Sequence, residues 1–405
     1  MNKRGRRLLT EVLVAALVLG SAAVAMADWQ AGVAAFKKKD YSTAIKEFQE
    51  VTKTNEDFAG GYYMLGLAQS QVGQLSQALG NLRKAVELDK GNAQYEVALG
   101  QGLVQAKQYG EAYGVLKAVD RSKLSRAQRS LQALLLASAA TRTNHAQDAV
   151  NVLAREARAE PSNARIQQAL GVAYNALGND ANAYRAFAAA YRLDPSDEES
   201  GRSAASAAIS SARRSRSSSD KMRLYNEAAA IAEKLAARHA TFDHNLLVGE
   251  AWLGAKSYDR ALPWFNKAKQ QRPQNALVYF YIGQCHSSTG KMDQALGELQ
   301  TALKMGPEGK LRRLIYDQMG YVLAKQKRYE KALDMYQSAG NNAKVQEMQA
   351  SIKKQKQNEE AQQEQAEYKR KIKALLAQAD ELEKLGQVEE ARAIRNQVKA
   401  LQKND

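Results

Sequence analysis

Residues 164–197 read ARIQQALGVAYNALGNDANAYRAFAAAYRLDPSD, a stretch with the pattern of two short helices and a turn between them. Leu170, Gly171, Tyr174 and Leu177 recur at spacings of one, three and three residues. That spacing puts them on one face of a helix with 3.6 residues per turn. Gly178 follows, and a glycine just after a helical stripe is typical of a residue at positive φ that ends a helix. The pattern therefore predicts a first helix that stops at about residue 177.

A second stripe follows the turn, formed by Ala183, Phe187 and Ala190 at spacings of four and three. Pro195 ends it, because proline has no amide proton and disfavours helical backbone at the residue before it. Two short helices with one apolar stripe each cannot bury both stripes alone. The stretch therefore predicts neighbouring copies of the same unit on each side.

Those copies are present, because the pattern recurs when the sequence is shifted by 34 residues. A fixed period of this length indicates a stacked array of helical repeats. Each unit carries a small residue on its first helix, and twelve residues later a small residue on its second helix. A bulky residue follows four positions further on. The first-helix residues are Gly32, Gly66, Gly100, Ala137, Gly171, Gly249 and Gly283; the second-helix pairs are Ala44/Phe48, Ala78/Leu82, Ala112/Leu116, Ala149/Leu153, Ala183/Phe187, Ala261/Phe265 and Ala295/Leu299.

This arrangement resembles the tetratricopeptide repeat (TPR) family over nearly all of the chain beyond residue 28. Turn residues lie in phase with it: Gly73, Asn144, Gly178, Lys256 and Gly290. The resemblance implies an all-α fold, a right-handed α-solenoid (superhelix) of about nine TPR helix pairs. We expect a C-terminal helical hairpin after the last pair. It also implies a concave groove that binds a ligand, and no chemistry of its own.

The period divides the chain into segments. We expect units 1–5 in residues 28–197, an irregular unit in 198–241, units 7–9 in 242–340, and a charged helix with a capping hairpin in 341–405. The ends of a solenoid need a polar cover to remain soluble. A short coiled-coil site for a partner is the alternative for the last segment.

The irregular unit carries a serine- and arginine-rich insertion, SSARRSRSSS at residues 210–219. It has no apolar period, so we interpret it as an exposed loop or a frayed helix extension, with the second helix resuming near Tyr225. Arg213, Arg214 and Arg216 are candidate anion-binding residues, because clustered guanidinium groups attract phosphate and other anions. A tolerated surface insertion without a function is the alternative.

Residues 1–27 have the form of a targeting segment. A basic start contains Lys3, Arg4, Arg6 and Arg7, an apolar run follows over residues 12–19, and residues 25–27 read AMA. This order is that of a secretory signal peptide with a small-x-small cleavage site. We expect cleavage after Ala27 and a periplasmic or secreted protein, with no transmembrane segment after cleavage. An uncleaved N-terminal membrane anchor is the alternative.

Composition excludes several functions. The net charge is +16, of which residues 1–27 contribute +3 and the remainder +13. This favours anionic partners or a solvated basic exterior. The four histidines include no i, i+4 pair, and the single cysteine, Cys285, lies where a small apolar side chain would pack. We therefore expect no catalytic residues, no metal site and no cofactor, and the protein should not be an enzyme. The leader argues against nucleic acid as the anion.

In the TPR family, first helices line the groove, and side chains next to the packing stripe face the ligand. Transferred to this sequence, that implies a partner-binding set of which we expect a part to be core packing. The set is Trp29, Val33, Phe36, Tyr63, Leu67, Ser70, Val97, Gln101, Val104, Gln168, Asn175, Phe280, Gln284 and Tyr321, with Val172, Leu246 and Glu250 beside them. Rings and amides suit an extended peptide or a helix.

We therefore expect a non-enzymatic scaffold that binds a protein or peptide partner in the concave groove, in an envelope or secretion complex. The alternative is a binder of an anionic envelope polymer, such as polysaccharide, cell wall or lipid headgroups, through a basic surface. Salt separates the two, because binding through exposed charges weakens as ionic strength rises.

Overall fold

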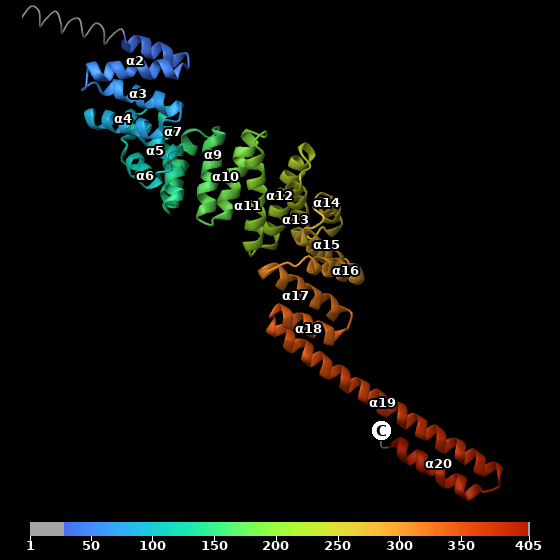
Figure 1. Cartoon of the computed structure of the whole chain (residues 1–405). Coiled ribbons are helices and arrows are strands. Elements are labelled where there is room, and N and C mark those ends of the chain that lie inside the picture. Colours follow the sequence, from blue (N-terminus) through green and yellow to red (C-terminus); the bar gives the residue numbers. More distant parts are fainter. Residues whose placement is uncertain (1–27, 404–405) are drawn as a thin grey trace, which may run out of the picture. The chain divides into compact units, whose positions relative to one another are not determined.

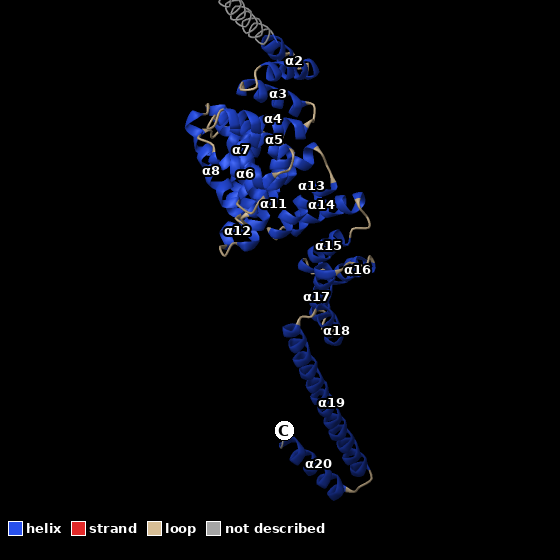
Figure 2. Cartoon of the chain, turned by 60° about the vertical axis from the view of Figure 1, so that its left-hand side comes forward, coloured by secondary structure: helices blue, strands red, loops and turns tan. Residues whose placement is uncertain are grey.

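The computed structural model describes residues 28–403, and in that range every regular element is a helix (Figures 1 and 2). The fold is an all-α solenoid, as the 34-residue period predicts. The predicted targeting segment and its cleavage site lie outside the described residues. The structure divides into two compact units, with the boundary between Ala255 and Lys256.

The first unit begins with a helix over 28–37 and continues through twelve α-helices and one short 3-10 helix, η1. Their bounds are α2 Tyr41–Thr54, α3 Ala59–Gln71, α4 Leu75–Leu88, α5 Ala93–Gln105, α6 Tyr109–Ala118, η1 Arg121–Lys123, α7 Arg126–Arg142, α8 Ala146–Ala159, α9 Ala164–Ala176, α10 Asp180–Leu193, α11 Glu198–Arg214, α12 Ser218–Arg238 and α13 Phe242–Gly254. Consecutive helices pack against each other, and α5, α7 and α9 also pack in succession as first helices.

The second unit contains seven helices in its described residues. They are α14 Tyr258–Gln271, α15 Ala276–Ser288, α16 Met292–Lys304, α17 Gly309–Lys325, α18 Tyr329–Ala339, α19 Asn342–Lys384 and α20 Val388–Lys403. From α14 to α18 the helices pack in chain order, and α19 and α20 form the C-terminal hairpin (Figure 1).

The small and bulky residues of the repeat hold each helix pair together. Phe187 of α10 is buried, and a Cβ atom built on Gly171 of α9 would lie 2.6 Å from its ring. At Gly100 the added atom would lie 2.4 Å from the side chain of Leu116. Real Cβ atoms do not come this close, so only glycine lets the second helix approach to this distance.

The turns between paired helices follow one backbone geometry. Gly178 has a φ of 67°, as its place after the first stripe predicts. In four units the same repeat position is a lysine with positive φ, namely Lys39, Lys107, Lys256 and Lys327, with φ between 58° and 62°. Residues other than glycine and asparagine rarely adopt a positive φ, because the Cβ atom crowds the backbone.

The serine- and arginine-rich insertion is not a loop. Residues 210–214 form the last turn of α11, only residues 215–217 link the helices, and α12 begins at Ser218. The expected restart near Tyr225 is therefore wrong, and the helix-extension interpretation is the one that holds. Ser217 explains the earlier start, because its side chain accepts a hydrogen bond from the backbone N–H of Asp220 and caps α12.

Beyond the last repeat, α19 runs unbroken for 43 residues. Its buried residues are Met348 near its start and Ile372 and Ala379 near its end, where α20 packs against it. The charged helix expected in 341–405 is therefore one continuous helix up to Lys384, before the turn to α20 (Figure 2).

Candidate interaction surfaces

The predicted groove residues differ in their exposure. Val97 and Phe280 are buried, at 5% exposure each, and the expectation that they face a ligand is wrong. Val97 packs with Ala93, Val119 and Leu124, in a segment after α6 that is three residues longer than the 34-residue period requires. Phe280 packs among the buried residues of α15, α16 and α17. Both lie at a helix position that faces a neighbouring helix in these units.

At the N-terminal end, the predicted residues Trp29 and Phe36 pack on the rings of neighbouring aromatic residues. Trp29 meets Phe58 edge-on at 5.1 Å between ring centroids and Phe48 at 5.5 Å. Phe36 meets the ring of Tyr41 in the same way, at 5.4 Å. Such pairs stabilise packing beyond the area that they bury. This end of the predicted groove is therefore partly a structural cluster, with Val33 beside it.

On α3, Tyr63 and Leu67 are half-buried against a core cluster formed by α4 to α10. The ring of Tyr63 lies 4.7 Å from that of Tyr95, and its hydroxyl accepts a hydrogen bond from Gln94 at 3.3 Å. Burial raises the pKa of Tyr63, so its hydroxyl stays protonated and able to donate. Ser70 turns inward and donates to the carbonyl of Gly66 at 2.9 Å.

The remaining predicted residues are polar or lie further along the chain. Gln168 donates to Asp197 at 3.1 Å, which ties α9 to the start of α11. Asn175 and Tyr321 are exposed, and Lys325 lies over the Tyr321 ring at 5.6 Å. The half-buried residues of the set that remain are Gln101, Val104 and Gln284.

Two exposed leucines on first helices were not predicted. Leu131 of α7 is 38% exposed and Leu314 of α17 is 41% exposed. Both follow a connection that is three residues longer than the period requires, since the small first-helix residues Gly100 and Ala137 lie 37 residues apart, as do Gly283 and Gly320. Their signal in the sequence is a leucine six residues before the small first-helix residue, Ala137 or Gly320. Val172 of α9 is 48% exposed, as expected for a residue that faces a ligand.

These findings define a set that we call the apolar row. Its members lie on four successive first helices, α3, α5, α7 and α9, and each is half-buried or exposed. They are Tyr63, Leu67, Val104, Leu131, Leu134 and Val172. Tyr63, Leu67, Val104 and Leu134 rest on one core cluster, so their positions are fixed by the packing beneath them.

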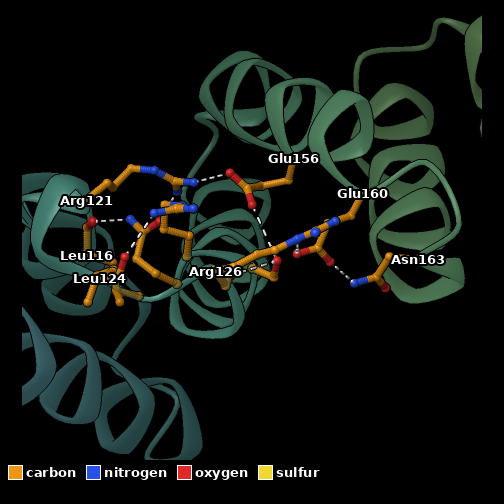
Figure 3. A network of polar contacts seen from close by, with 10 residues as sticks. Leu116, Arg121, Leu124, Arg126, Glu156, Glu160 and Asn163 are labelled. Atoms are coloured by element: carbon orange, nitrogen blue, oxygen red, sulfur yellow. Dashed lines mark hydrogen bonds and ion pairs between the residues drawn. The ribbon is translucent and has the colours of Figure 1, made fainter.

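A buried polar network holds α7, the helix that carries Leu131 (Figure 3). Arg121 of η1 makes an ion pair with Glu156 of α8 and a hydrogen bond to Gln132. Ser130 donates to the second oxygen of Glu156 at 3.3 Å, and Gln132 donates to the carbonyl of Leu116 at 2.6 Å. Ser130 and Gln132 are both held inward, so Leu131 between them lies on the opposite side of the helix.

A second arm of this network joins α7 to the end of α8 (Figure 3). Arg126 pairs with Glu160 at 2.8 Å and donates to the carbonyl of Ala159 at 3.0 Å. Glu160 also accepts from Asn163 at 2.8 Å. These contacts therefore join α6, α7 and α8 through polar groups in addition to apolar packing.

The arginines predicted to bind anions have carboxylate partners in two of three cases. Arg213 pairs with Glu250 of α13 at 3.0 Å, and Arg214 pairs with Asp180 of α10 at 3.0 Å. Arg214 also donates to the carbonyl of Gly178 at 2.8 Å. The two side chains therefore fasten the end of α11 to α10 and α13. Arg216 is exposed in the link before α12.

A cavity of about 760 Å³ opens beside this link, between the start of α10, the end of α11 and the start of α12. Its arginines are Arg185, Arg214 and Arg223, and its carboxylates are Asp180, Asp220 and Glu227. Arg223 pairs with Glu227 at 3.0 Å, and Tyr184 donates to Glu227 at 2.8 Å. Three charges of each sign balance, so the cavity has no excess charge that would select an anion.

No described group of three or more His, Cys, Asp or Glu side chains is arranged to hold a metal ion. Cys285 is buried at 1% exposure, and burial raises its pKa to about 12, which keeps the thiol protonated. Within residues 28–403, no helix combines the length and the apolar character that a membrane crossing requires.

Family models for the tetratricopeptide repeat match residues 59–92, 134–198 and 220–276. No curated protein sequence matches the chain. Among solved structures, the C-terminal part of a TPR repeat-containing protein from Cytophaga hutchinsonii aligns with a TM-score of 0.50 at 13% identity. That alignment covers 63% of this chain and 99% of the other.

A tetratricopeptide repeat protein from Parabacteroides merdae aligns over 64% of this chain and 98% of its own, at 15% identity and a TM-score of 0.43. Yeast Tom70 aligns over 92% and 96%, at 13% identity and a TM-score of 0.31. TPR arrays are generally non-enzymatic scaffolds for protein–protein interaction. The recurring helix pairs, their glycine contacts and the family models agree: the matched stretches of this chain are tetratricopeptide repeats.

Proposed function

We propose that the protein is a non-enzymatic scaffold that binds an apolar-rich segment of a partner protein along the apolar row. The observation that carries this proposal is the exposure of Leu131 and Val172 on first helices, at 38% and 48%. Exposed apolar side chains that gather on one face, rather than singly, are typical of interaction sites. A partner segment would bury them together with the half-buried Tyr63 and Leu67.

The row is fixed before any partner arrives. Its half-buried members pack against the core cluster, and the Arg121–Glu156 network fixes the rotation of α7. A surface that is already ordered spends less conformational entropy on binding, so a few apolar contacts suffice for measurable affinity. The segment that fits is an extended peptide or an amphipathic helix with apolar side chains repeated along one side.

The test replaces Leu131 and Val172 with serine, because both side chains are exposed and their loss leaves the core intact. Leu193→Ser is the matched control, since Leu193 is 42% exposed but lies at the end of a second helix, α10. Partners captured from envelope fractions by the tagged wild-type chain are quantified by mass spectrometry beside both variants. The double variant should recover at least about fivefold less of the bound partner.

Recovery that falls equally in the control, or in neither variant, would contradict binding along the row. Circular dichroism melting curves of all three chains provide the folding check. The same capture repeated at high salt should retain the partner, because apolar contacts are not screened.

We place this scaffold outside the cytoplasm, in an envelope or secretion complex, on the basis of the basic start, apolar run and small-x-small site in residues 1–27. The intact mass of the protein purified from its natural source tests this. A mass that begins at Asp28 supports export with cleavage, and a mass that includes residues 1–27 contradicts it.

Binding of an anionic polymer is the second candidate function, supported by the charge of +13 beyond residue 27. The serine- and arginine-rich segment is a poor location for it, because Arg213 and Arg214 already have carboxylate partners. Loss of the natural ligand between low and high salt would favour this candidate over groove binding.

A further inference from the structure

The positive charge of the chain is concentrated in its second compact unit. Residues 256–405 contain 27 Lys and Arg against 18 Asp and Glu, whereas residues 28–255 contain 28 against 24. The second unit therefore carries +9 and the first +4, although the first is the longer. A basic surface that acts in binding should be sought in the second unit.

One cavity in this unit gathers unpaired basic side chains. It has a volume of about 340 Å³ and lies between the α17–α18 turn with the start of α18 on one side and α19 on the other. Its basic side chains are Lys327, Arg328, Lys331 and Lys356, against two carboxylates, Glu330 and Glu359. We call it the basic cleft.

The basic groups of the cleft differ from those near the serine- and arginine-rich segment. Within the described residues, Lys327, Lys331 and Lys356 have no carboxylate at ion-pair distance, and Arg328 contacts only the amide oxygen of Gln326, at 3.2 Å. Glu359 is already bonded by Gln355 at 2.9 Å, which directs it along α19. Four cations therefore remain available to a ligand, and the cleft has an excess charge of +2.

The walls set the size of the ligand. Tyr329 and Ile352 line the cleft and are half-buried, and Tyr329 packs against a core cluster of α17, α18 and α19. Lys327 has a φ of 58°, a conformation that places its side chain at the tip of the turn. Converging cations on a preformed concave surface suit a compact group with more than one negative charge.

We propose that the basic cleft binds a phosphate-bearing anion, either the headgroup of an anionic phospholipid or a small free phosphate compound. This site goes beyond binding along the apolar row, which lies in the other compact unit. Phosphate is favoured over a single carboxylate because its oxygens can accept from several donors at once, and the cleft offers one guanidinium and three ammonium groups.

The test uses the mature full-length chain with two probes. Vesicles of phosphatidylglycerol and phosphatidylcholine in equal parts, with pure phosphatidylcholine as reference, are assayed by co-sedimentation. Inorganic pyrophosphate is assayed by isothermal titration calorimetry. Binding to the acidic vesicles alone identifies a membrane headgroup as the source, whereas binding of pyrophosphate identifies a free phosphate compound.

The cleft variant is Arg328→Gln, Lys331→Gln and Lys356→Gln in one chain. The matched control is Lys369→Gln, Arg370→Gln and Lys373→Gln, which removes the same charge from exposed positions on α19 outside the cleft. The cleft variant should lose about 100-fold in affinity for the probe that binds. The control should lose less than about threefold, since distant exposed charges are screened.

Equal losses in the two variants would overturn the proposal, because binding would then follow net charge rather than the cleft. Failure of the wild-type chain to bind either probe at low ionic strength would overturn it as well. The cleft variant should still recover partners captured through the apolar row, so the two proposals can fail independently.

Discussion

Helices α9 and α19 differ in how much of their surface packs against other helices. Residues of α9 touch α8, α10 and α7, and Gly171 packs against the ring of Phe187. The middle of α19, from Lys353 to Glu367, is exposed at every position and contains no buried residue. One helix is therefore held by its neighbours and the other by its own backbone hydrogen bonds and side-chain propensities.

Substitutions in these two regions should affect stability through different interactions. In the packed repeats the cost of a substitution depends on atoms a few ångströms away on another helix. In the middle of α19 it depends only on helix propensity, because there is no partner helix to disturb. Substitutions at packed positions should therefore have larger effects than matched changes on exposed surfaces.

The largest expected contrast is in thiol reactivity. Burial raises the pKa of Cys285 to about 12, from an ordinary value of 9.0, so less thiolate is present at pH 8. Iodoacetamide should alkylate the native chain about a thousandfold more slowly than a Cys285→Ala, Gln362→Cys variant, whose thiol lies on the exposed face of α19. Mass spectrometry of timed samples measures both rates, and comparable rates would show that α15 opens readily.

The next contrast concerns ion pairs. Glu156→Ala leaves the guanidinium of Arg121 largely buried without its carboxylate, and should lower the free energy of unfolding by about 3–5 kcal/mol. Glu111→Ala removes the exposed partner of Arg83 and should cost less than about 1 kcal/mol. Urea denaturation followed by circular dichroism gives both values. Similar losses of unfolding free energy in the two variants would mean that the network in Figure 3 contributes little to stability.

Glycines at packed and open positions give a smaller contrast of opposite sign. Gly100→Ala places a methyl group 2.4 Å from Leu116 and should destabilise the chain by about 1–3 kcal/mol. Gly114 lies on α6, where an added Cβ atom would have no atom of another element within 4 Å. Gly114→Ala should therefore stabilise the chain by up to about 1 kcal/mol, because alanine has the higher helix propensity. Thermal melts of the two variants should shift in opposite directions, and a shared direction would contradict the packing argument.

The smallest effect is expected in the middle of α19. Gln362→Gly should reduce helicity by local fraying and leave the main unfolding transition within about 0.5 kcal/mol of the wild type, because residue 362 touches no other helix. Hydrogen exchange resolves the local change, and urea denaturation resolves the global one. A shift of the main transition as large as that of Gly100→Ala would show that α19 stabilises the repeats.

Much of the fold could be predicted from the sequence, because the repeat uses short-range signals. Gly178 predicts a turn with positive φ, and Gly171 with Phe187 predicts close contact between paired helices, and both are confirmed. The 34-residue period could not predict the structure of the inserted segments, because local capping and packing determine it. Ser217 starts α12 early, and the polar contacts of Arg121 depend on Glu156, which is 35 residues away.

The interaction surface was harder to predict for a physical reason. A side chain next to the packing stripe faces either a ligand or the next unit, and the choice depends on how far adjacent first helices are rotated. Val97 and Phe280 turn toward neighbouring helices. Val172 and Gln101 each follow the small first-helix residue by one position, yet Val172 is exposed and Gln101 is half-buried. The 34-residue period also could not predict the basic cleft, because one side of the cleft comes from a turn and the other from a helix outside the repeats.

The Arg121–Glu156 contact has a consequence for how such an array can change length. Units that meet only through apolar stripes can be deleted or duplicated in steps of 34 residues, and each new junction repeats the old one. At the junction between α6 and α8, a deletion that removes only one of Arg121 and Glu156 would leave the other charge unpaired inside the array. This junction therefore makes the order of the repeats matter, and shortened or extended forms of the chain should be assembled elsewhere.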